Sequence, residues 1–285
     1  KSPVMLSSEY YSKRCSSASK MAFNPNTTFI ECDCSSVHMA KPVVFITGGG
    51  RRIGAAISAM LMDEGYYVLI HVRNSVEEAQ SIIDAHTSAN DGEISGDIIR
   101  ADLLRADISE LITTIQNHPK VIEFGGLSGL INNASVYQPI SFDELTFEEF
   151  KKNFTIHVEV PFLLTKGLFE QLKAKSGSVI GLVDTSQGRA WKDLTHYTAS
   201  KNALRQMMVN LAGDLHPHVR VNCIAPGAII SAAWEIEHFA SVLEKVPMGR
   251  SGEPKDIASA AKFLLESDHI SGQIINVDGG WTLVE

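Results

Sequence analysis

The sequence predicts an α/β fold: a doubly wound, seven-stranded parallel sheet of the Rossmann type in a single domain. First, short apolar runs alternate with longer helical patterns from Lys41 onward, and parallel strands need such crossover helices. Second, the first apolar run leads directly into a glycine-rich turn at 47–54. Third, 285 residues with 44% hydrophobic content suffice for one large core. In such a sheet, ligands collect at the carboxyl ends of the strands.

The individual elements follow from this alternation. Strands are expected at 43–47, 67–72, about 97–101, 128–132, 177–183, 219–224 and 273–277. Helices are expected near 52–64, 76–88, 106–117, 146–174, 195–214 and 255–266. The irregular stretch after Pro226, reaching to about Glu244, is long for a compact domain and is interpreted as a substrate lid.

Residues 1–40 differ from the rest of the chain. They are rich in Ser, Asn and Thr and have no sustained periodicity, so we expect a mostly disordered extension outside the 41–285 domain. Met39 stands directly before the first strand. Three of the four cysteines lie in this extension, too few for a disulfide scaffold, and Cys32-x-Cys34 lacks a second ligand pair for a metal.

The charge excludes some partners. The formal net charge of −8 argues against nucleic acid or an anionic membrane as the main partner. No apolar run approaches the roughly eighteen residues needed to cross a bilayer. We therefore expect a soluble protein, located in the cytoplasm.

The glycine-rich turn at 47–54 lies between a predicted strand and a predicted helix. Glycines let backbone N–H groups approach a dinucleotide pyrophosphate, and the helix N-terminus adds partial positive charge. An ordinary turn is the alternative. The spacing is TGxxxRxG, with Arg52 where a glycine is more usual. Gly48, Arg52 and Ile53 are the expected cofactor contacts.

The end of the second strand indicates which dinucleotide binds. An acidic residue would hold the ribose 2′-hydroxyl of NAD here, but the chain has Arg73, Asn74 and Ser75 instead. A cation with polar donors suits a 2′-phosphate, so NADPH is the predicted cofactor; a solvated loop charge is the alternative. Asp102 and Leu103 close the third strand, where the carboxylate could accept from the adenine amino group or cap the following turn.

The fourth strand runs into Asn133, Ala134 and Ser135, small and polar residues that let the backbone pass beside a flat cofactor. The alternative is a simple turn. Tyr137 is then placed to stack on a planar substrate, although an aromatic in a loop can equally be a packing residue.

The fifth strand ends at Asp184, and Tyr197 and Lys201 follow on the next helix. Because the tyrosine and lysine are four residues apart, they share one helix face. A lysine ammonium beside a phenol favours the phenolate, so the tyrosine becomes a competent proton donor near neutrality. The lysine can also hold the nicotinamide ribose hydroxyls. Alone the pair carries little weight, since it is common on exposed helices.

Together these motifs resemble the short-chain dehydrogenase/reductase family over about 41–285, including Pro226-Gly227 and the closing 272–280 segment. Pro226 and Gly227 are expected, by this resemblance, to contact the cofactor. Within the family the chain looks most like the pteridine reductases and the bacterial dihydromonapterin reductases. The features that point there are Arg52, Ser135 in place of Gly, Tyr137, and Asp184 in place of the usual catalytic serine.

That resemblance implies NADPH-dependent reduction of a dihydropterin, with dihydrofolate as a further substrate, by a homotetramer. The pterin ring would lie between the nicotinamide and Tyr137. Arg52 and Ser135 would contact the pterin or a cofactor phosphate. Asp184 and Tyr197 would also contact the substrate and, with Lys201, carry the proton transfer.

One residue departs from the general family pattern. His157 occupies a helix position where most members keep an asparagine that anchors a proton-relay water, and the dihydromonapterin reductases share this histidine. A packed helix residue is the alternative.

Two other functions compete with this prediction. A 3-oxoacyl thioester reductase would usually keep serine at 184 and glycine at 135, and this chain has neither. A non-catalytic NADP-binding sensor would have no need of Tyr197 and Lys201 at working spacing.

Overall fold

The computed structural model describes residues 41–186, 188–231 and 236–284. The predicted disordered extension at 1–40, and the three cysteines within it, lie outside the described residues. No helix in these three ranges is long and apolar enough to cross a membrane.

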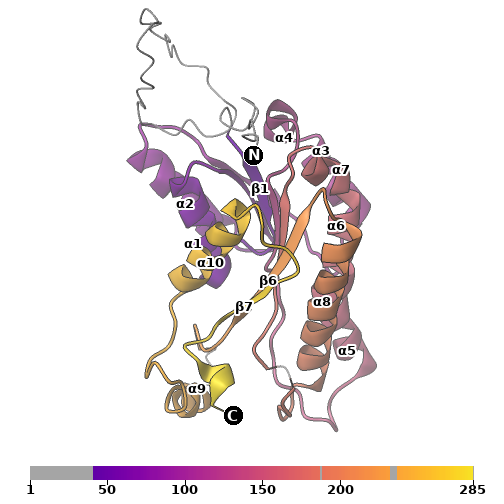
Figure 1. The fold of residues 1–285 in the computed structure, drawn as a ribbon, viewed down its shortest axis with the longest axis vertical. Coiled ribbons are helices and arrows are strands. Elements are labelled where there is room, and N and C mark those ends of the chain that lie inside the picture. The colour runs from indigo at the N-terminus through magenta and orange to yellow at the C-terminus, as the bar shows by residue number, and fades with distance from the viewer. Residues whose placement is uncertain (1–40, 187, 232–235, 285) are drawn as a thin grey trace, which may run out of the picture. The chain divides into compact units, whose positions relative to one another are not determined.

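The described residues form a seven-stranded, fully parallel sheet in the order β3-β2-β1-β4-β5-β6-β7 (Figure 1). The strands are β1 (Val43–Ile46), β2 (Tyr67–Val72), β3 (Gly96–Arg100), β4 (Gly129–Asn132), β5 (Ser178–Leu182), β6 (Arg220–Pro226) and β7 (Ile274–Val277). The predicted fold class is confirmed. From β1 the sheet is extended to one side by β2 and β3 and to the other side by β4 to β7, so the strand order reverses between β1 and β4. In such sheets a crevice lies at the carboxyl ends of the strands that flank this switch point.

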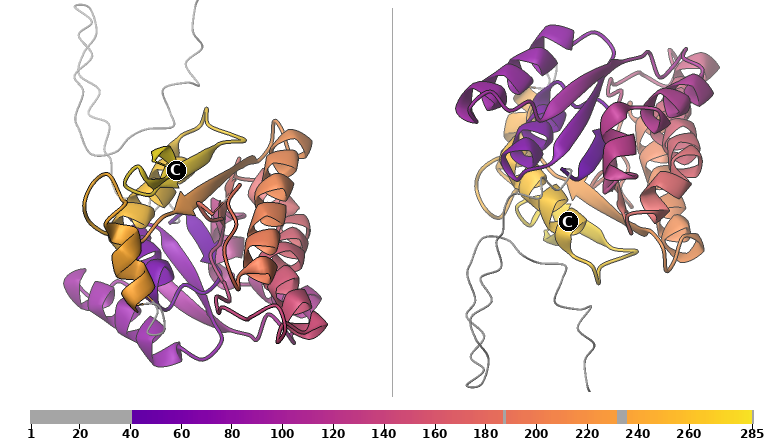
Figure 2. Two further views of the ribbon diagram at one scale, coloured as in Figure 1. Left: turned by 90° about the horizontal axis from the view of Figure 1, so that it is seen from below. Right: turned by 90° about the horizontal axis from the view of Figure 1, so that it is seen from above.

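Helices cover both faces of the sheet (Figures 1 and 2). On one face lie α1 (Arg52–Asp63), α2 (Val76–Ala89) and α10 (Pro254–Glu266). On the other lie α3 (Ile108–Gln116), α4 (Pro119–Phe124), α5 (Phe147–Phe154), α6 (Val160–Gly167), α7 (Phe169–Lys173) and α8 (Thr195–Asp214). Two further pieces, α9 (Ile236–Leu243) and the 3₁₀ turn η3 (Trp281–Leu283), lie close together at one end of the molecule (Figure 1).

The strands are buried on both faces, which is why they read as continuous apolar runs. In β1, Val44 and Ile46 pack into the core beneath α1 and α10, whereas Val43 and Phe45 pack into the core on the α8 side. All four are fully buried. Two cores therefore clamp the sheet and hold its carboxyl ends in fixed positions.

The stretch 146–174 is helical, as predicted, but it is not one regular α-helix. The structure divides this stretch into α5, the π-helical turn η2 (Thr155–Glu159), α6 and α7. Pro161, the second residue of α6, has no backbone N–H, so the carbonyl of His157 lacks its α-helical donor. A π-helical turn accommodates such a break with one extra residue, and such turns are frequent at functional sites.

Two more elements differ from the expectations. The short helix α4 was not predicted; Pro119 begins it and Gly125, in the left-handed conformation, ends it. The stretch after Pro226 is not irregular throughout, because it contains α9. Whether that stretch closes as a lid stays a prediction.

Candidate functional site

A cavity of about 690 Å³ lies at the carboxyl ends of the strands, where the topology predicts a ligand. All residues singled out as site candidates line it. They are Gly48, Arg52, Ile53, Arg73, Asn74, Ser75, Asp102, Leu103, Asn133, Ala134, Ser135, Tyr137, Asp184, Tyr197, Lys201, Pro226 and Gly227. Their individual roles toward cofactor and substrate stay predictions.

Close packing around the glycine-rich turn explains why glycine stands at two of its positions. Gly48 has φ +65°, a conformation that favours glycine, and a Cβ there would lie 3.1 Å from Ala134 Cα. A Cβ on Gly54 would overlap the Gly48 carbonyl oxygen and lie 2.7 Å from Asn133 Nδ2. The turn therefore leaves no room for a side chain at Gly54, and at Gly48 a side chain would be both crowded and strained by the positive φ.

Asn133 holds this turn against the end of β4. Its Nδ2 donates to the carbonyl oxygens of Thr47 and Gly48, each at 2.9 Å. In return, Thr47 Oγ1 accepts from the backbone N–H groups of Asn133 and Ala134, each at 3.0 Å. The Asn133 Nδ2 group thus hydrogen-bonds within the protein, and it connects the ends of β1 and β4.

His71 was not predicted and completes the same framework. Its ring is buried; Nδ1 accepts from the Gly48 N–H at 3.1 Å, and Nε2 donates to the Ala101 carbonyl at 3.1 Å. Burial lowers the pKa of His71 to about 4, so the ring is neutral and the hydrogen-bond directions follow. In the sequence, His71 could have been noticed as the one charged or strongly polar residue in the otherwise apolar strand β2.

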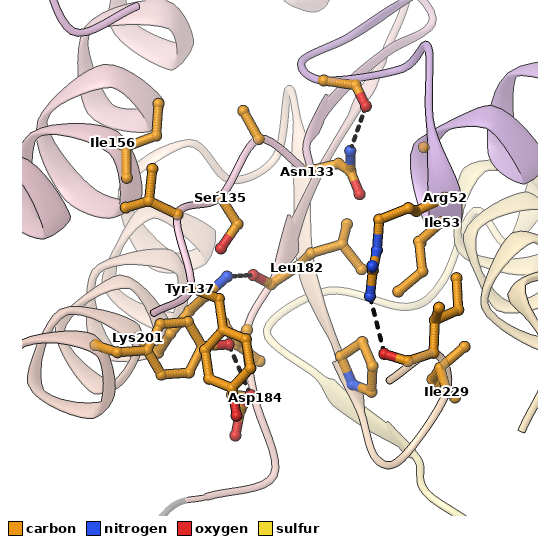
Figure 3. A pocket seen from close by; sticks show the side chains of 18 of the residues that line it. Arg52, Ile53, Asn133, Ser135, Tyr137, Ile156, Leu182, Asp184, Lys201 and Ile229 are labelled. Atoms are coloured by element: carbon orange, nitrogen blue, oxygen red, sulfur yellow. Dashed lines mark hydrogen bonds between the residues drawn. The ribbon is translucent and has the colours of Figure 1, made fainter. Parts of the chain in front are cut away.

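Arg52 begins α1 with φ 54°, the left-handed region, which accounts for the usual glycine at this position. Its guanidinium donates to the Ile230 carbonyl at 2.8 Å, and Figure 3 shows Arg52 and Ile229 on the same side of the cavity. This cation therefore connects the start of α1 with the segment after β6.

The predicted 2′-phosphate site lies at the end of β2. Arg73 and Asn74 are exposed, and the Arg73 carbonyl accepts from Arg100 Nε at 3.3 Å. At the end of β3, Asp102 Oδ1 accepts from the Leu104 N–H at 3.1 Å. The turn-capping alternative for Asp102 is what the structure shows; a contact with adenine stays a prediction.

The three predicted catalytic side chains meet at one end of the cavity. Tyr197 donates its phenolic hydrogen to Asp184 Oδ2 at 2.8 Å, and Asp184 Oδ1 accepts from the Ser186 N–H at 2.7 Å. Lys201 Nζ donates to the Leu182 carbonyl at 2.7 Å and lies 5.8 Å from the centre of the Tyr197 ring. Figure 3 shows Asp184, Lys201 and Tyr137 on the side of the cavity opposite Arg52.

Burial dominates the electrostatics of Lys201. It lowers the pKa of the ammonium to about 8, against the opposing pull of Asp184. The side chain is 4% exposed. With a pKa of about 8 the ammonium form still predominates near neutral pH, so Lys201 can donate hydrogen bonds to an oxygen ligand.

Aromatic rings surround this end of the cavity. The Tyr137 ring lies 4.8 Å from the Tyr197 ring, centre to centre, and is 38% exposed. Trp191 and Trp281, with ring centres 6.0 Å apart, pack with Val242 and form an apolar wall that sequence reasoning missed. Nothing in a linear pattern relates the two tryptophans, since they lie 90 positions apart.

Comparison with known proteins now identifies the family. A sequence profile of the family described as enoyl-(acyl carrier protein) reductase matches residues 49–282. The chain belongs to the short-chain dehydrogenase/reductase family. It is an NAD(P)-dependent oxidoreductase.

Relatives of this short-chain reductase carry different names. Galactitol 2-dehydrogenase of Agrobacterium fabrum is 30% identical, over 86% of this chain and 98% of its own length. A Brucella suis structure named FolM alternative dihydrofolate reductase 1, in complex with NADP, is 29% identical with a TM-score of 0.78, over 87% of this chain and 97% of that one. A Serratia marcescens short-chain dehydrogenase/reductase mutant is 26% identical with a TM-score of 0.76, over 86% and 100%.

Proposed function

We propose that this reductase uses NADPH to reduce a dihydropterin to its tetrahydro form, with dihydrofolate as a second candidate substrate. The observation that carries the proposal is the 2.8 Å hydrogen bond from Tyr197 to Asp184 at the cavity wall. A carboxyl group beside the proton-donating phenol suits a ring nitrogen, which must receive a proton. The Brucella structure named for dihydrofolate reduction supports the same assignment.

The cavity fits a dinucleotide. The glycine-rich turn excludes a Cβ at Gly54, and Gly48 there has a positive φ that favours glycine. The first residues of α1, Arg52, Ile53 and Gly54, line the cavity, and the first N–H groups of a helix have no intrahelical partner. Arg73, Asn74 and Ser75 would hold the 2′-phosphate, and Lys201 the nicotinamide ribose. When bound, NADPH supplies the hydride.

The chain itself supplies position and protons. Tyr197 presents its hydroxyl hydrogen toward the cavity wall, and Asp184 accepts that hydrogen bond on Oδ2. The phenol gives its hydroxyl hydrogen to the substrate nitrogen, and solvent water entering the cavity returns a proton to the phenolate. Before the transfer, Asp184 positions the hydroxyl through the 2.8 Å contact. The Lys201 ammonium, held by the Leu182 carbonyl, stabilises the transient phenolate.

The substrate end of the cavity is aromatic. The half-exposed Tyr137 ring offers a face for a planar ligand, and Trp191 and Trp281 bound the space beyond it. A flat, conjugated ring such as a pterin suits these walls. We expect the active form to be a homotetramer in the cytoplasm.

A second candidate function is carbonyl reduction, of a 3-oxoacyl thioester or a sugar. The galactitol 2-dehydrogenase relative favours it. Tyr197 and Lys201 would serve a carbonyl oxygen as well as a ring nitrogen. Asp184 is the residue that counts against it, because a neutral donor suits a developing oxyanion better than a carboxylate does.

The experiment follows NADPH oxidation with dihydromonapterin, dihydrobiopterin, dihydrofolate and an acetoacetyl thioester in parallel. Turnover of a dihydropterin well above that of the thioester is expected. Turnover of the thioester alone would favour the carbonyl reductase. NADPH binding without turnover of any substrate would favour the sensor.

A further inference from the structure

A chain of hydrogen bonds runs from the cavity into the protein interior behind the catalytic tyrosine. Ser135 Oγ, exposed on the segment after β4, lies 2.8 Å from His157 Nε2. His157 Nδ1 lies 2.8 Å from Ser200 Oγ, and Ser200 Oγ lies 2.8 Å from the Tyr197 carbonyl oxygen. Both ring nitrogens of His157 thus have an oxygen at hydrogen-bond distance, which defines the orientation of the ring.

The direction of every bond in this chain follows from its inner end. A carbonyl oxygen can only accept, so Ser200 donates its one hydroxyl hydrogen to the Tyr197 carbonyl. Ser200 must then accept from His157, which places the ring hydrogen on Nδ1. A neutral imidazole has one N–H, so Nε2 is an acceptor and Ser135 donates its hydroxyl hydrogen to it.

His157 is neutral in this setting. The ring is 1% exposed, and burial, reinforced by the charge of Lys201, lowers its pKa well below the usual value. An imidazolium here would be a buried cation close to the Lys201 ammonium, which both burial and charge repulsion disfavour. The single-hydrogen ring is therefore the state that the surroundings select.

We propose that Ser135 acts only as a hydrogen-bond acceptor toward the cavity and there recognises an N–H group of the bound ligand. His157 and Ser200 are the positioning residues that set this direction. Its only hydroxyl hydrogen is committed to His157, so two oxygen lone pairs remain for a ligand. A phosphate or carbonyl oxygen offers no hydrogen and would meet those lone pairs unfavourably. Under this proposal Ser135 contacts an N–H group, and a contact with a cofactor phosphate would fall to Arg52.

The local fold explains how His157 reaches both serines. It lies in the π-helical turn η2, which shifts the helix register ahead of Pro161. Its ring also packs edge-on against the Tyr197 ring, 5.6 Å between centres at 85°. One buried side chain thus connects the ligand-facing Ser135 with the backbone that carries the catalytic tyrosine.

The N–H group has two chemical sources, the carboxamide of a nicotinamide cofactor or the 2-amino group of a pterin. An N–H from the pterin 2-amino group would specify the proposed function further, and this source rests on that function. An N–H from the nicotinamide carboxamide does not require a pterin substrate. The experiments below separate the two.

The first test reads the His157 tautomer directly, by ¹⁵N–¹H NMR on the full chain labelled at histidine, with His157→Gln to assign the signal among ten histidines. The hydrogen is expected on Nδ1 in the parent protein. Ser135→Ala should leave it there, because Ser200 still accepts it. Ser200→Ala should move population to Nε2. A hydrogen on Nε2 in the parent protein would overturn the proposal, with or without a pterin substrate.

The second test pairs each ligand with a version lacking the N–H. NADPH is titrated beside its 3-acetylpyridine analogue, and dihydrobiopterin is assayed beside its 2-dimethylamino derivative. In one pair the parent protein should prefer the N–H form, and Ser135→Ala should reduce that preference by about tenfold, the scale of one hydrogen bond. Ser135→Thr, which keeps the hydroxyl, should restore it.

The pair that responds identifies the source of the N–H. An unchanged preference in both pairs would overturn the acceptor role of Ser135. Failure of every dihydropterin to turn over would refute the proposed function, while the tautomer and the NADPH pair would still decide this inference.

Discussion

At the scale of single residues, we expect the cofactor preference to depend on a guanidinium at the end of β2. Arg73 lines the cavity, and neither neighbour in the sequence, Val72 or Asn74, is acidic. Arg73→Ala should weaken NADPH binding by about 1.5–3 kcal/mol for each charge-assisted hydrogen bond lost, with little change for NADH. Dissociation constants for both cofactors measure this.

Arg105 provides the matched control for that substitution. It is also exposed and follows the neighbouring strand β3, but it does not line the cavity. Arg105→Ala should leave both dissociation constants unchanged. If the parent protein uses NADH as well as NADPH, the role assigned to Arg73 is wrong.

Residue identities in the site could be predicted because the chemistry lies in local motifs at strand ends. Their hydrogen-bond partners could not. Asn133 looks like a ligand contact in the sequence, but its Nδ2 is used by Thr47 and Gly48, which are 86 and 85 positions away. For His157 the sequence left open a proton-relay position or a packed helix residue. The structure shows features of both, because the ring is buried in the interior and is also connected to the cavity through Ser135. Only the folded structure brings such partners together.

At the scale of elements, the strands and the longer helices were predicted within a few residues, because apolar periodicity marks them strongly. The division of 146–174 was not, because a π-helical turn adds a single residue and barely disturbs the pattern of apolar positions. Pro161 was the visible sign of the break. The helix α9 was not predicted, because the stretch after Pro226 was interpreted as a loop from its length. The short apolar pattern within that stretch was not considered.

The junction of β1 and α1 gives a prediction at this scale. Gly54→Ala would place a methyl group against the Gly48 carbonyl and the Asn133 amide, so the glycine-rich turn must shift. We expect unfolding to become easier by about 1–3 kcal/mol, the usual cost of overpacking, together with weaker NADPH binding. Thermal unfolding and a cofactor titration measure the two effects.

Gly213, in α8, supplies a control with the opposite sign. No atom lies within 4 Å of a Cβ built there, and its φ is not positive. Gly213→Ala should stabilise the protein by about 0.5–1 kcal/mol and leave cofactor binding alone. A Gly54→Ala protein as stable as the parent, with unchanged affinity, would show that the turn adapts.

At the scale of the whole molecule, buried Lys201 makes stability depend on pH. Its pKa of about 8 in the folded protein lies below the ordinary 10.5, so between these values the unfolded chain binds more protons. The cost of burying the charge is full below pH 8 and disappears as pH rises to about 10.5. Relative to Lys201→Met, the parent protein should therefore gain about 3 kcal/mol over that window.

Urea unfolding of both proteins at pH 7 and pH 10 measures this gain. Lys192→Met, which removes an exposed lysine from the loop before α8, should show no comparable trend. A constant difference between the parent and Lys201→Met at the two pH values would contradict the assignment of a buried, charged lysine.

The N-terminal segment raises a separate question at this scale. The seven strands lie entirely within 43–277, and residues 1–38 lack the apolar periodicity needed to join a core. A protein beginning at Met39 should therefore melt at the same temperature and turn over at the same rate as the full chain. A large drop in either quantity would give the segment a role in the fold or the site.

The most direct measurement is the rate of dihydropterin reduction by Asp184→Ser. Asp184 is the residue that separates a pterin reductase from a ketone reductase, through its 2.8 Å contact with Tyr197. The substitution should lower the rate by about 10²–10⁴-fold, the scale of positioned acid–base catalysis, while the dissociation constant for NADPH stays within twofold or so. Reduction of dihydropterins at the parental rate would contradict the account, because the proton would then come from another group.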